Sequence, residues 1–314
     1  MYGEIKIFTG NAHVELAKEI ANYLRLPLGG ADVFQFPNEN IFVQLHSSVR
    51  GQDVFVIQPM SRPVNDHIME LLIMIDTLKR DSAGRITAVF PYMGYSRSDK
   101  KDQPRVPITA RLMADLIQTA GADRYMTIDL HAGQIQGFFQ IPGDELTAFH
   151  IQRDYLLSKN LKDVVVVAPD AGRAKDARYL ADALGAELAI VEKRRYGNDP
   201  TAKVMQLIGN VKDCTAVLFD DEIDTAGTIS NAIHFLKDSG AQDIYAVATH
   251  AILSGPAIER LRTAPITELI LTNTVDIPPE KQLPNMTILS VASLLGEVIR
   301  RTHFGISVGA LFNE

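Results

Sequence analysis

Short apolar runs alternate with longer helical patterns along the whole chain, and this alternation restricts the possible folds most strongly. The runs are continuously apolar, as in Val164–Ala168, rather than alternately apolar and polar. Such a strand is buried on both faces, which is typical of a parallel sheet covered by helices. The pattern therefore predicts an α/β protein with mainly parallel sheets flanked by helices.

The order of the predicted elements repeats along the chain. Strands are expected at Ile5–Thr9, Asp53–Gln58, Arg85–Phe90, Arg124–Leu130, Val164–Ala168, Glu187–Val191, Thr215–Phe219, Ile244–Thr249 and Glu268–Thr272. Helices are expected at Pro63–Arg80, Ile108–Ala120, Ala174–Leu184, Ile229–Ser239 and Gly255–Thr263. Ligands of open α/β sheets bind beyond the carboxyl ends of the strands, so polar clusters that follow strands are candidate sites.

The chain length of 314 residues suggests two domains, at roughly 100–200 residues per domain. Two segments look related. Gly121 and Gly240 each follow a helical pattern and precede a strand with a Tyr, and a His stands ten residues after each Gly, at His131 and His250. The likeness is short, but it fits duplication of one α/β unit. We expect one domain at 1–147 and a second at 148–314, and the C-terminal residues could pack across both.

Composition excludes several classes of protein. The net charge is −7, whereas a general nucleic-acid or anionic-membrane surface requires a basic face. Cys214 is the single cysteine, so no intrachain disulfide or cysteine-rich metal site can form. No apolar run approaches the roughly 18 residues of a membrane span, and the N-terminus lacks the apolar core of a signal peptide. A cytoplasmic protein without a nucleic-acid or membrane partner is expected.

The segment from Asp220 to Thr228 carries the strongest functional signal. Two adjacent acids, Asp220 and Asp221, follow a buried strand, and small and hydroxyl residues then lead into a helix. The acids can accept hydrogen bonds from the vicinal hydroxyls of a sugar, or from metal-bound water. The small residues and the helix N-terminus can surround a phosphate. The alternative is an acidic surface loop with a Thr at the helix start.

Phe219–Thr228 resembles the phosphoribosyl-diphosphate-binding signature of the type I phosphoribosyltransferase fold, and the rest of the chain resembles the ribose-phosphate diphosphokinase (PRPP synthetase) family. The other matching segments are Val64–Asp66 with Met69–Ile75, Pro91–Tyr92 with Tyr95–Arg97, Asp129–Ala132 with Gln134–Phe139, and Thr249–His250 with Leu253–Pro256. The resemblance runs nearly from end to end. It implies two tandem phosphoribosyltransferase-like domains with the active site between them.

The resemblance assigns the sugar and metal sites. Asp220 and Asp221 would hold the ribose hydroxyls, and Asp224, Thr225, Ala226, Gly227 and Thr228 would hold the 5-phosphate. Asp170, Ala171 and Gly172 match the diphosphate loop, although Arg173 stands where the family usually has Gly. Asp170 and His131 match the residues that bind Mg²⁺. From its position alone, His131 would be read as structural, because imidazole is not a usual magnesium ligand.

The basic run around Lys193 and Arg195 follows a predicted strand. Such a run is usually a solvated loop. In the family, a mobile loop at this place supplies a catalytic Lys and Arg, which match Lys193 and Arg195. Transfer of a diphosphoryl group depends on stabilising charge, so two cations suit the reaction.

Two further segments match the ATP-binding residues of the family. Arg97, with Ser98 and Asp99, follows the strand that ends near Phe90, although Gln is usual at position 98. Phe36 would stack on adenine and Asn38 would hydrogen-bond to it, whereas the family normally has an acid at position 40 in place of Asn40. Without the resemblance, Phe36–Asn40 reads as a hairpin turn. The list of expected ATP-binding residues is therefore Phe36, Asn38, Asn40, Arg97, Ser98 and Asp99.

These features favour transfer of the β,γ-diphosphoryl group of ATP to ribose 5-phosphate, with Mg²⁺ as cofactor. A homo-oligomer is expected, based on a dimer and with a hexamer as one option. One alternative is a phosphoribosyltransferase that consumes phosphoribosyl diphosphate, which the duplicated architecture and the Lys193–Arg195 segment disfavour. The other alternative is a regulatory subunit without activity. The retained acidic and basic residues disfavour it, but it stays open because of the departures from the family at Asn40, Ser98 and Arg173.

Overall fold

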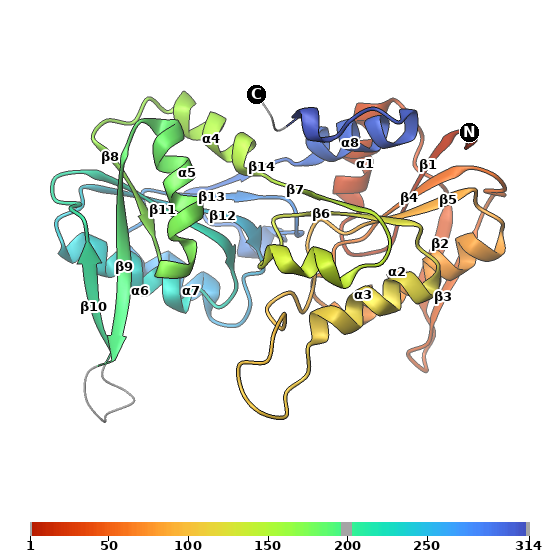
Figure 1. Cartoon of the computed structure of the whole chain (residues 1–314), viewed down its shortest axis with the longest axis horizontal. Helices are drawn as coiled ribbons and strands as arrows, with labels where there is room; N and C mark the ends of the chain where they lie inside the picture. Colours follow the sequence, from red (N-terminus) through yellow and green to blue (C-terminus); the bar gives the residue numbers. More distant parts are fainter. Residues whose placement is uncertain (1, 196–202, 312–314) are drawn as a thin grey trace. The chain divides into compact units, whose positions relative to one another are not determined.

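The computed structural model describes residues 2–195 and 203–311. The chain divides into two compact units (Figure 1). Unit 1 contains Met1–Thr147, Thr274–Asp276 and Ser290–Glu314, and unit 2 contains Ala148–Asn273 and Ile277–Leu289. The sequence-based division assigned 148–314 to the second domain and allowed the C-terminal residues to pack across both, whereas 274–276 and 290–314 group with unit 1.

Unit 1 is built on a parallel sheet in the order β1-β4-β5-β6-β7. These strands are β1 (Ile5–Thr9), β4 (Asp53–Ile57), β5 (Arg85–Val89), β6 (Arg124–Ile128) and β7 (Gly143–Leu146). In Figure 1, helices α1 (Val14–Leu24) and α8 (Ala292–Phe304) lie on one side of the sheet, and α2 (Val64–Arg80) and α3 (Thr109–Ala120) lie on the other. An antiparallel hairpin of β2 (Ala31–Gln35) and β3 (Ile41–Leu45) packs against α2.

The C-terminal helix α8 belongs to unit 1 because polar and packing contacts attach it there. Asp53 is fully buried at the start of β4, and its carboxylate accepts two hydrogen bonds from Arg85, at 2.8 and 2.6 Å. His303 of α8 lies 2.8 Å from the same carboxylate. Gly296 lies so close to Tyr23 of α1 that a Cβ would come within 2.4 Å of its ring. Since a buried carboxylate needs such partners, this cluster fixes α8 on the sheet.

Unit 2 contains a sheet in the order β10-β9-β8-β11-β12-β13-β14, parallel except for the β9–β10 pair. The strands are β8 (Val164–Ala168), β9 (Glu187–Arg195), β10 (Lys203–Ile208), β11 (Thr215–Ile223), β12 (Asp243–Ala251), β13 (Glu268–Thr272) and β14 (Met286–Leu289). The helices are α4 (Phe149–Ser158), α5 (Ala174–Leu184), α6 (Gly227–Asp238) and α7 (Ala257–Thr263). Short 3-10 turns occur in unit 2 at Ala171–Arg173 and Pro279–Lys281, and in unit 1 at Gly133–Phe138 and Gly309–Leu311.

The apolar strands of unit 2 face helices on both sides. Val165 and Leu218 belong to the core that contains α6 and α7, whereas Val166 and Val217 belong to the core that contains α4 and α5. Successive residues of a strand point to opposite faces, so both neighbours in the sequence must be apolar. The continuous apolar runs arise in this way, and the predicted α/β architecture with mainly parallel sheets is confirmed.

Some boundaries differ from the predicted ones. β11 was expected to end at Phe219 but continues to Ile223, because β12 pairs with it as far as Ile223↔Ala251. β9 was expected to end at Val191 but continues to Arg195, because β10 pairs with it in antiparallel register. Among the residues that the structure describes, no helix is both long and apolar enough to cross a membrane.

Candidate active site

The two adjacent acids lie inside the last part of β11 rather than after it. β8 pairs with β11 only as far as Leu218, whereas β12 continues to pair beyond that residue. The Asp221 amide donates to the Asp220 side chain at 2.9 Å, and the Glu222 amide donates to the Asp221 side chain at 2.9 Å. Each of these amides is thus paired with the side chain of the residue before it. The result is a strand end that presents two carboxylates next to each other.

Arg173 connects the acidic pair to the turn that follows β8. Its guanidinium forms an ion pair with Asp221 and lies 3.6 Å from Asp220. It also lies 3.2 Å from Asp176 in the first turn of α5. Burial alone would lower the pKa of Arg173, but the charges of Asp221, Asp220 and Asp176 raise it above its ordinary value. The guanidinium therefore stays charged among three carboxylates.

The pair of carboxylates is poorly solvated. Burial, together with the neighbouring Asp221 charge, raises the pKa of Asp220 to about 8, and Arg173 opposes this rise. Asp220 therefore tends to hold a proton in the ligand-free site. In its ionised form the pair only accepts hydrogen bonds, so that form suits a ligand that donates them.

The loop from Asp224 to Thr228 leads directly into α6. Ala226 has a left-handed backbone, with φ 57°, and precedes the first helical residue, Gly227. The carboxylate of Asp224 accepts a hydrogen bond from Ser254, and the Asp224 carbonyl accepts one from the Ser254 amide at 3.0 Å. Thr225 and Thr228 are exposed. The first amides of a helix have no partner within the helix and attract anions, so this end of α6 can bind a phosphate.

Asp170 stands at the end of β8 and shapes the next turn. One of its side-chain oxygens accepts hydrogen bonds from the Gly172 amide, at 2.9 Å, and from the Arg173 amide, at 3.2 Å. Asp170, Ala171 and Gly172 are all exposed. An exposed carboxylate is a hard oxygen ligand, so the chemistry of Asp170 fits Mg²⁺. Within the described residues, no group of three or more His, Cys, Asp or Glu residues could hold a metal by itself.

The backbone of Lys193 and Arg195 lies in strand β9 rather than in a loop. Their register partners in β10 are Met205 and Lys203. The segment was expected to be a mobile loop, and the antiparallel partner strand explains the difference. The end of that segment, residues 196–200, lies outside the described residues.

In unit 1, the segment Arg97–Asp99 and the residues after His131 are joined by a hydrogen bond. The buried carboxylate of Asp99 accepts from Gln134 at 2.6 Å. The Ser98 hydroxyl accepts from the Thr109 amide at 3.1 Å, and so fixes the start of α3. Arg97 is exposed and His131 is half-buried. The structure therefore brings Asp99 close to the His131 segment, while Ser98 acts locally on a helix end.

Residues Phe36–Asn40 form the exposed turn of the β2–β3 hairpin. The Phe36 amide donates to the Asn40 carbonyl at 2.8 Å, and the Asn40 amide donates to the Asn38 side chain at 3.2 Å. The ring of Phe36 is 43% exposed and contacts Phe34 and Phe42, with ring centroids 5.0 and 5.7 Å away. The turn thus presents an aromatic ring and an amide side chain to solvent.

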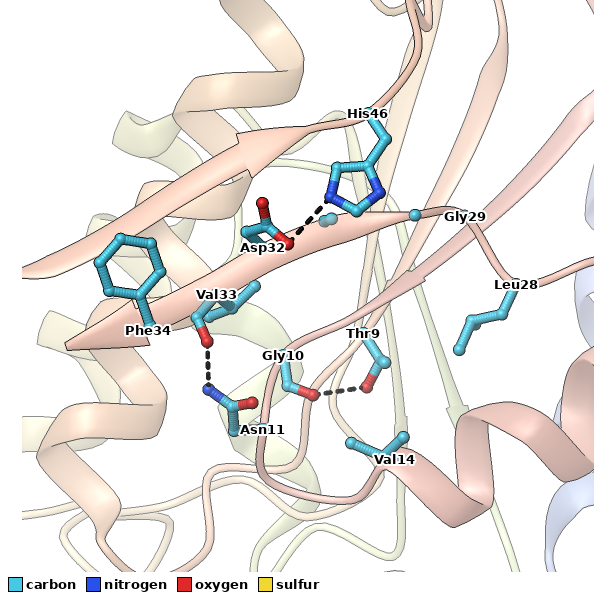
Figure 2. A pocket seen from close by; sticks show the side chains of 12 residues that line it. Thr9, Gly10, Asn11, Val14, Leu28, Gly29, Asp32, Val33, Phe34 and His46 are labelled. Atoms are coloured by element: carbon cyan, nitrogen blue, oxygen red, sulfur yellow. Dashed lines mark hydrogen bonds and ion pairs between the residues drawn. The ribbon is translucent and has the colours of Figure 1, made fainter.

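A separate cavity of about 580 Å³ lies at the base of the same hairpin (Figure 2). Asn11 donates to the Val33 carbonyl at 3.2 Å, and His46 lies 2.9 Å from Asp32. None of the predicted site residues lines this cavity. The predicted sites instead lie on the hairpin turn and after the strands.

Sequence reasoning missed Arg260. Its guanidinium, in α7, donates to the Thr225 carbonyl at 2.9 Å. The only signal was its position in a helix that follows the Thr249–Pro256 resemblance. Arg173, which stands where the family usually has Gly, forms ion pairs with the acidic pair and with Asp176.

Comparison with known proteins now decides the family. The chain matches the family model for the N-terminal domain of ribose phosphate pyrophosphokinase over residues 5–121. It also matches the model of a phosphoribosyl synthetase-associated domain over residues 198–313. It is 50% identical over 307 residues to a ribose-phosphate pyrophosphokinase of Campylobacter jejuni, and the match covers 98% of each chain. The chain belongs to the ribose-phosphate pyrophosphokinase family.

Other members of the ribose-phosphate pyrophosphokinase family agree in length and fold. The ribose-phosphate pyrophosphokinase of Bacillus caldolyticus is 50% identical to this chain, and the match covers 99% of this chain and 98% of the relative. The crystal structure of phosphoribosylpyrophosphate synthetase from Mycobacterium smegmatis has a TM-score of 0.92 at 44% identity, with 96% of this chain and 100% of that chain covered. The predicted pair of phosphoribosyltransferase-like domains is thereby confirmed as the fold.

Proposed function

We propose that this chain transfers the β,γ-diphosphoryl group of ATP to the C1 hydroxyl of ribose 5-phosphate, giving AMP and 5-phosphoribosyl 1-diphosphate. The observation that carries the proposal is 50% identity to ribose-phosphate pyrophosphokinases over 98% of both chains. The carboxylates at the end of β11 and the N-terminus of α6 support it, because one segment can then bind both the hydroxyls and the phosphate of a sugar phosphate.

The sugar would be held by unit 2. Asp220 and Asp221 accept hydrogen bonds from the ribose hydroxyls, and the loop from Asp224 through Thr225, Ala226 and Gly227 to Thr228 surrounds the 5-phosphate. The N-terminal amides of α6 donate to this phosphate and add a favourable dipole. Asp170, Ala171 and Gly172 receive the diphosphate, with the turn shaped by the Asp170 side chain.

The nucleotide would be held by residues of unit 1. Phe36 stacks on the base, Asn38 and Asn40 meet its edge, and Arg97 pairs with the phosphates. Asp99 positions the His131 segment through Gln134, and Ser98 orders the same loop from the start of α3. These roles follow the family resemblance, and the contacts of Asp99 and Ser98 suit positioning better than direct binding.

The transfer forms a bond between the C1 oxygen and the β-phosphorus and breaks the bond from that phosphorus to the α,β-bridging oxygen. The bridging oxygen leaves with AMP, and the proton of the C1 hydroxyl is released to solvent. Lys193 and Arg195 stabilise the charge on the transferring group. Asp170 and His131 would hold Mg²⁺, and the ion would neutralise phosphate charge and help to orient the nucleotide. A cytoplasmic location and a homo-oligomer, dimer-based or hexameric, are part of this proposal.

The test is incubation with ATP, Mg²⁺ and ribose 5-phosphate, followed by phosphorus NMR and nucleotide chromatography. AMP and 5-phosphoribosyl 1-diphosphate should appear in equal amounts, and only when the sugar phosphate and Mg²⁺ are both present. Formation of ADP with a sugar that gained a single phosphate would contradict diphosphoryl transfer. An absence of any product would favour a regulatory subunit.

A further inference from the structure

Arg173 is held between two segments that the proposed sugar site uses. Its backbone amide donates to Asp170 at 3.2 Å, and its guanidinium pairs with Asp221. The side chain is 17% exposed, and those of Asp220 and Asp221 are 16% and 9% exposed. The backbone of Arg173, with φ −94° and ψ 0°, needs no glycine. The guanidinium is therefore a built part of this site and not a surface side chain that happens to lie near it.

The positive charge of Arg173 reduces the electrostatic repulsion between Asp220 and Asp221. Two adjacent carboxylates with little access to water repel each other, and one of them tends to take up a proton. A protonated carboxyl group turns one oxygen into a donor and is a weaker acceptor than a carboxylate, so it would hold the hydrogen of a sugar hydroxyl less tightly. A guanidinium cannot lose its proton under these conditions, and its planar donors suit carboxylate oxygens. Arg173 thus opposes the uptake of a proton by the pair and favours the form in which both carboxylates accept hydrogen bonds.

We propose that Arg173 is a positioning residue for sugar recognition, whose fixed charge lets Asp220 and Asp221 bind the ribose hydroxyls without a divalent cation. The proposal rests on the proposed function, because it states how that same site recognises its sugar. A divalent cation near the pair would supply the same charge. The loss of Arg173 should therefore matter most when Mg²⁺ is absent.

A merely structural role would look different. The 3.2 Å pair between Arg173 and Asp176 lies within the first turn of α5, and it could stabilise that helix whether or not a sugar binds. Asp176→Asn removes this local pair and leaves the bridge to Asp221 in place. Arg178→Ala removes the same charge from an exposed position of the same helix. Arg173→Lys keeps the charge but loses the planar fork of donors.

The experiment measures ribose 5-phosphate binding by calorimetry, without nucleotide, in chelator and again in saturating Mg²⁺. Without Mg²⁺, Arg173→Ala should weaken binding by about 10-fold or more, as expected for a lost charge-assisted interaction. Mg²⁺ should close most of this gap. Arg173→Lys should lie between Arg173→Ala and the wild type, and Arg178→Ala and Asp176→Asn should match the wild type. Thermal unfolding of each variant identifies any loss of folding. If Arg173→Ala does not fold, the affinity of Arg173→Lys is compared with that of the wild type instead.

Three outcomes would overturn the inference. Arg173→Ala could bind as tightly as the wild type in chelator, Asp176→Asn could weaken binding as much as Arg173→Ala, or the wild type could bind the sugar only with Mg²⁺. Failure of the proposed function is recognised separately, because the wild type would then form no 5-phosphoribosyl 1-diphosphate from ATP and ribose 5-phosphate.

Discussion

Arg260 in α7 donates a hydrogen bond of 2.9 Å to the backbone carbonyl of Thr225, in the loop between β11 and α6. Gly227 makes room for this contact, because a Cβ there would lie 3.2 Å from the Arg260 nitrogen. A loop that wraps a phosphate must hold its amides in fixed directions. Arg260 therefore fixes the loop from outside and adds a positive charge beside it.

We predict that Arg260→Ala weakens the use of ribose 5-phosphate. One hydrogen bond from a charged donor contributes about 1.5–3 kcal/mol, so KM for the sugar should rise by roughly 10-fold or more while kcat changes little. Steady-state kinetics with saturating ATP measure both constants. Arg262→Ala, in the same helix at an exposed position, is the matched control. An unchanged KM in Arg260→Ala would show that the loop keeps its shape without this contact.

Lys193→Ala tests the charge stabilisation of the transferring group. If Lys193 acts mainly in the transition state, kcat should fall by about 10²–10³, as for loss of one preorganised donor. Calorimetry should show little change in ribose 5-phosphate affinity. A variant that keeps full kcat and only raises a KM would mean that Lys193 binds substrate and does not stabilise transfer.

The architecture could be predicted because burial on both faces of a strand leaves a continuous apolar run. Val164–Ala168 and Glu268–Thr272 end where the sequence indicated, and Ala174–Leu184 is a helix as expected. The less apolar elements, such as β2 and β3 with their exposed faces, carry a weaker pattern. Contacts between residues that are far apart in the sequence leave no such pattern. The contact of His303 in α8 with Asp53 could therefore not be predicted from the sequence.

The site was partly predictable for the same reason. Asp220 and Thr228 stand at a strand end and a helix start, where local chemistry indicates a ligand. Arg173 was visible as an unusual cation, but its pairing with Asp221 depends on two strands meeting, and the sequence separation of 48 residues hides it. Arg260 lies 35 residues from Thr225 and was hidden likewise.

Asn40 should affect the choice of nucleotide. A carboxylate at this position only accepts hydrogen bonds, which suits the amino group of adenine, whereas an amide both donates and accepts. We predict a higher GTP-to-ATP ratio of kcat/KM in the wild type than in Asn40→Glu. Asn40→Gln, which lengthens the side chain but keeps the amide, is the control and should retain the wild-type ratio. Equal ratios in all three proteins would remove Asn40 from base recognition.

Asp220 should make the stability of the ligand-free protein depend on pH. Its pKa is raised from 3.8 to about 8 in the folded state by burial and by Asp221. Between these values the folded state holds a proton that the unfolded state releases. The free energy of unfolding therefore falls as pH rises through this range, with a slope of at most about 1.4 kcal/mol per pH unit from this group.

Asp220→Asn removes the titrating group and keeps the shape of the side chain. We predict that the fall in stability from about pH 5 to about pH 8 becomes shallower in this variant, measured as the denaturant midpoint in Mg²⁺-free buffer without sugar. Asp182→Asn, on the exposed face of α5, is the control and should keep the wild-type slope. Arg173→Ala should steepen the dependence near its upper end, because Arg173 opposes the rise in the pKa of Asp220. Identical slopes in the wild type and Asp220→Asn would mean that Arg173 already holds both carboxylates ionised throughout this range.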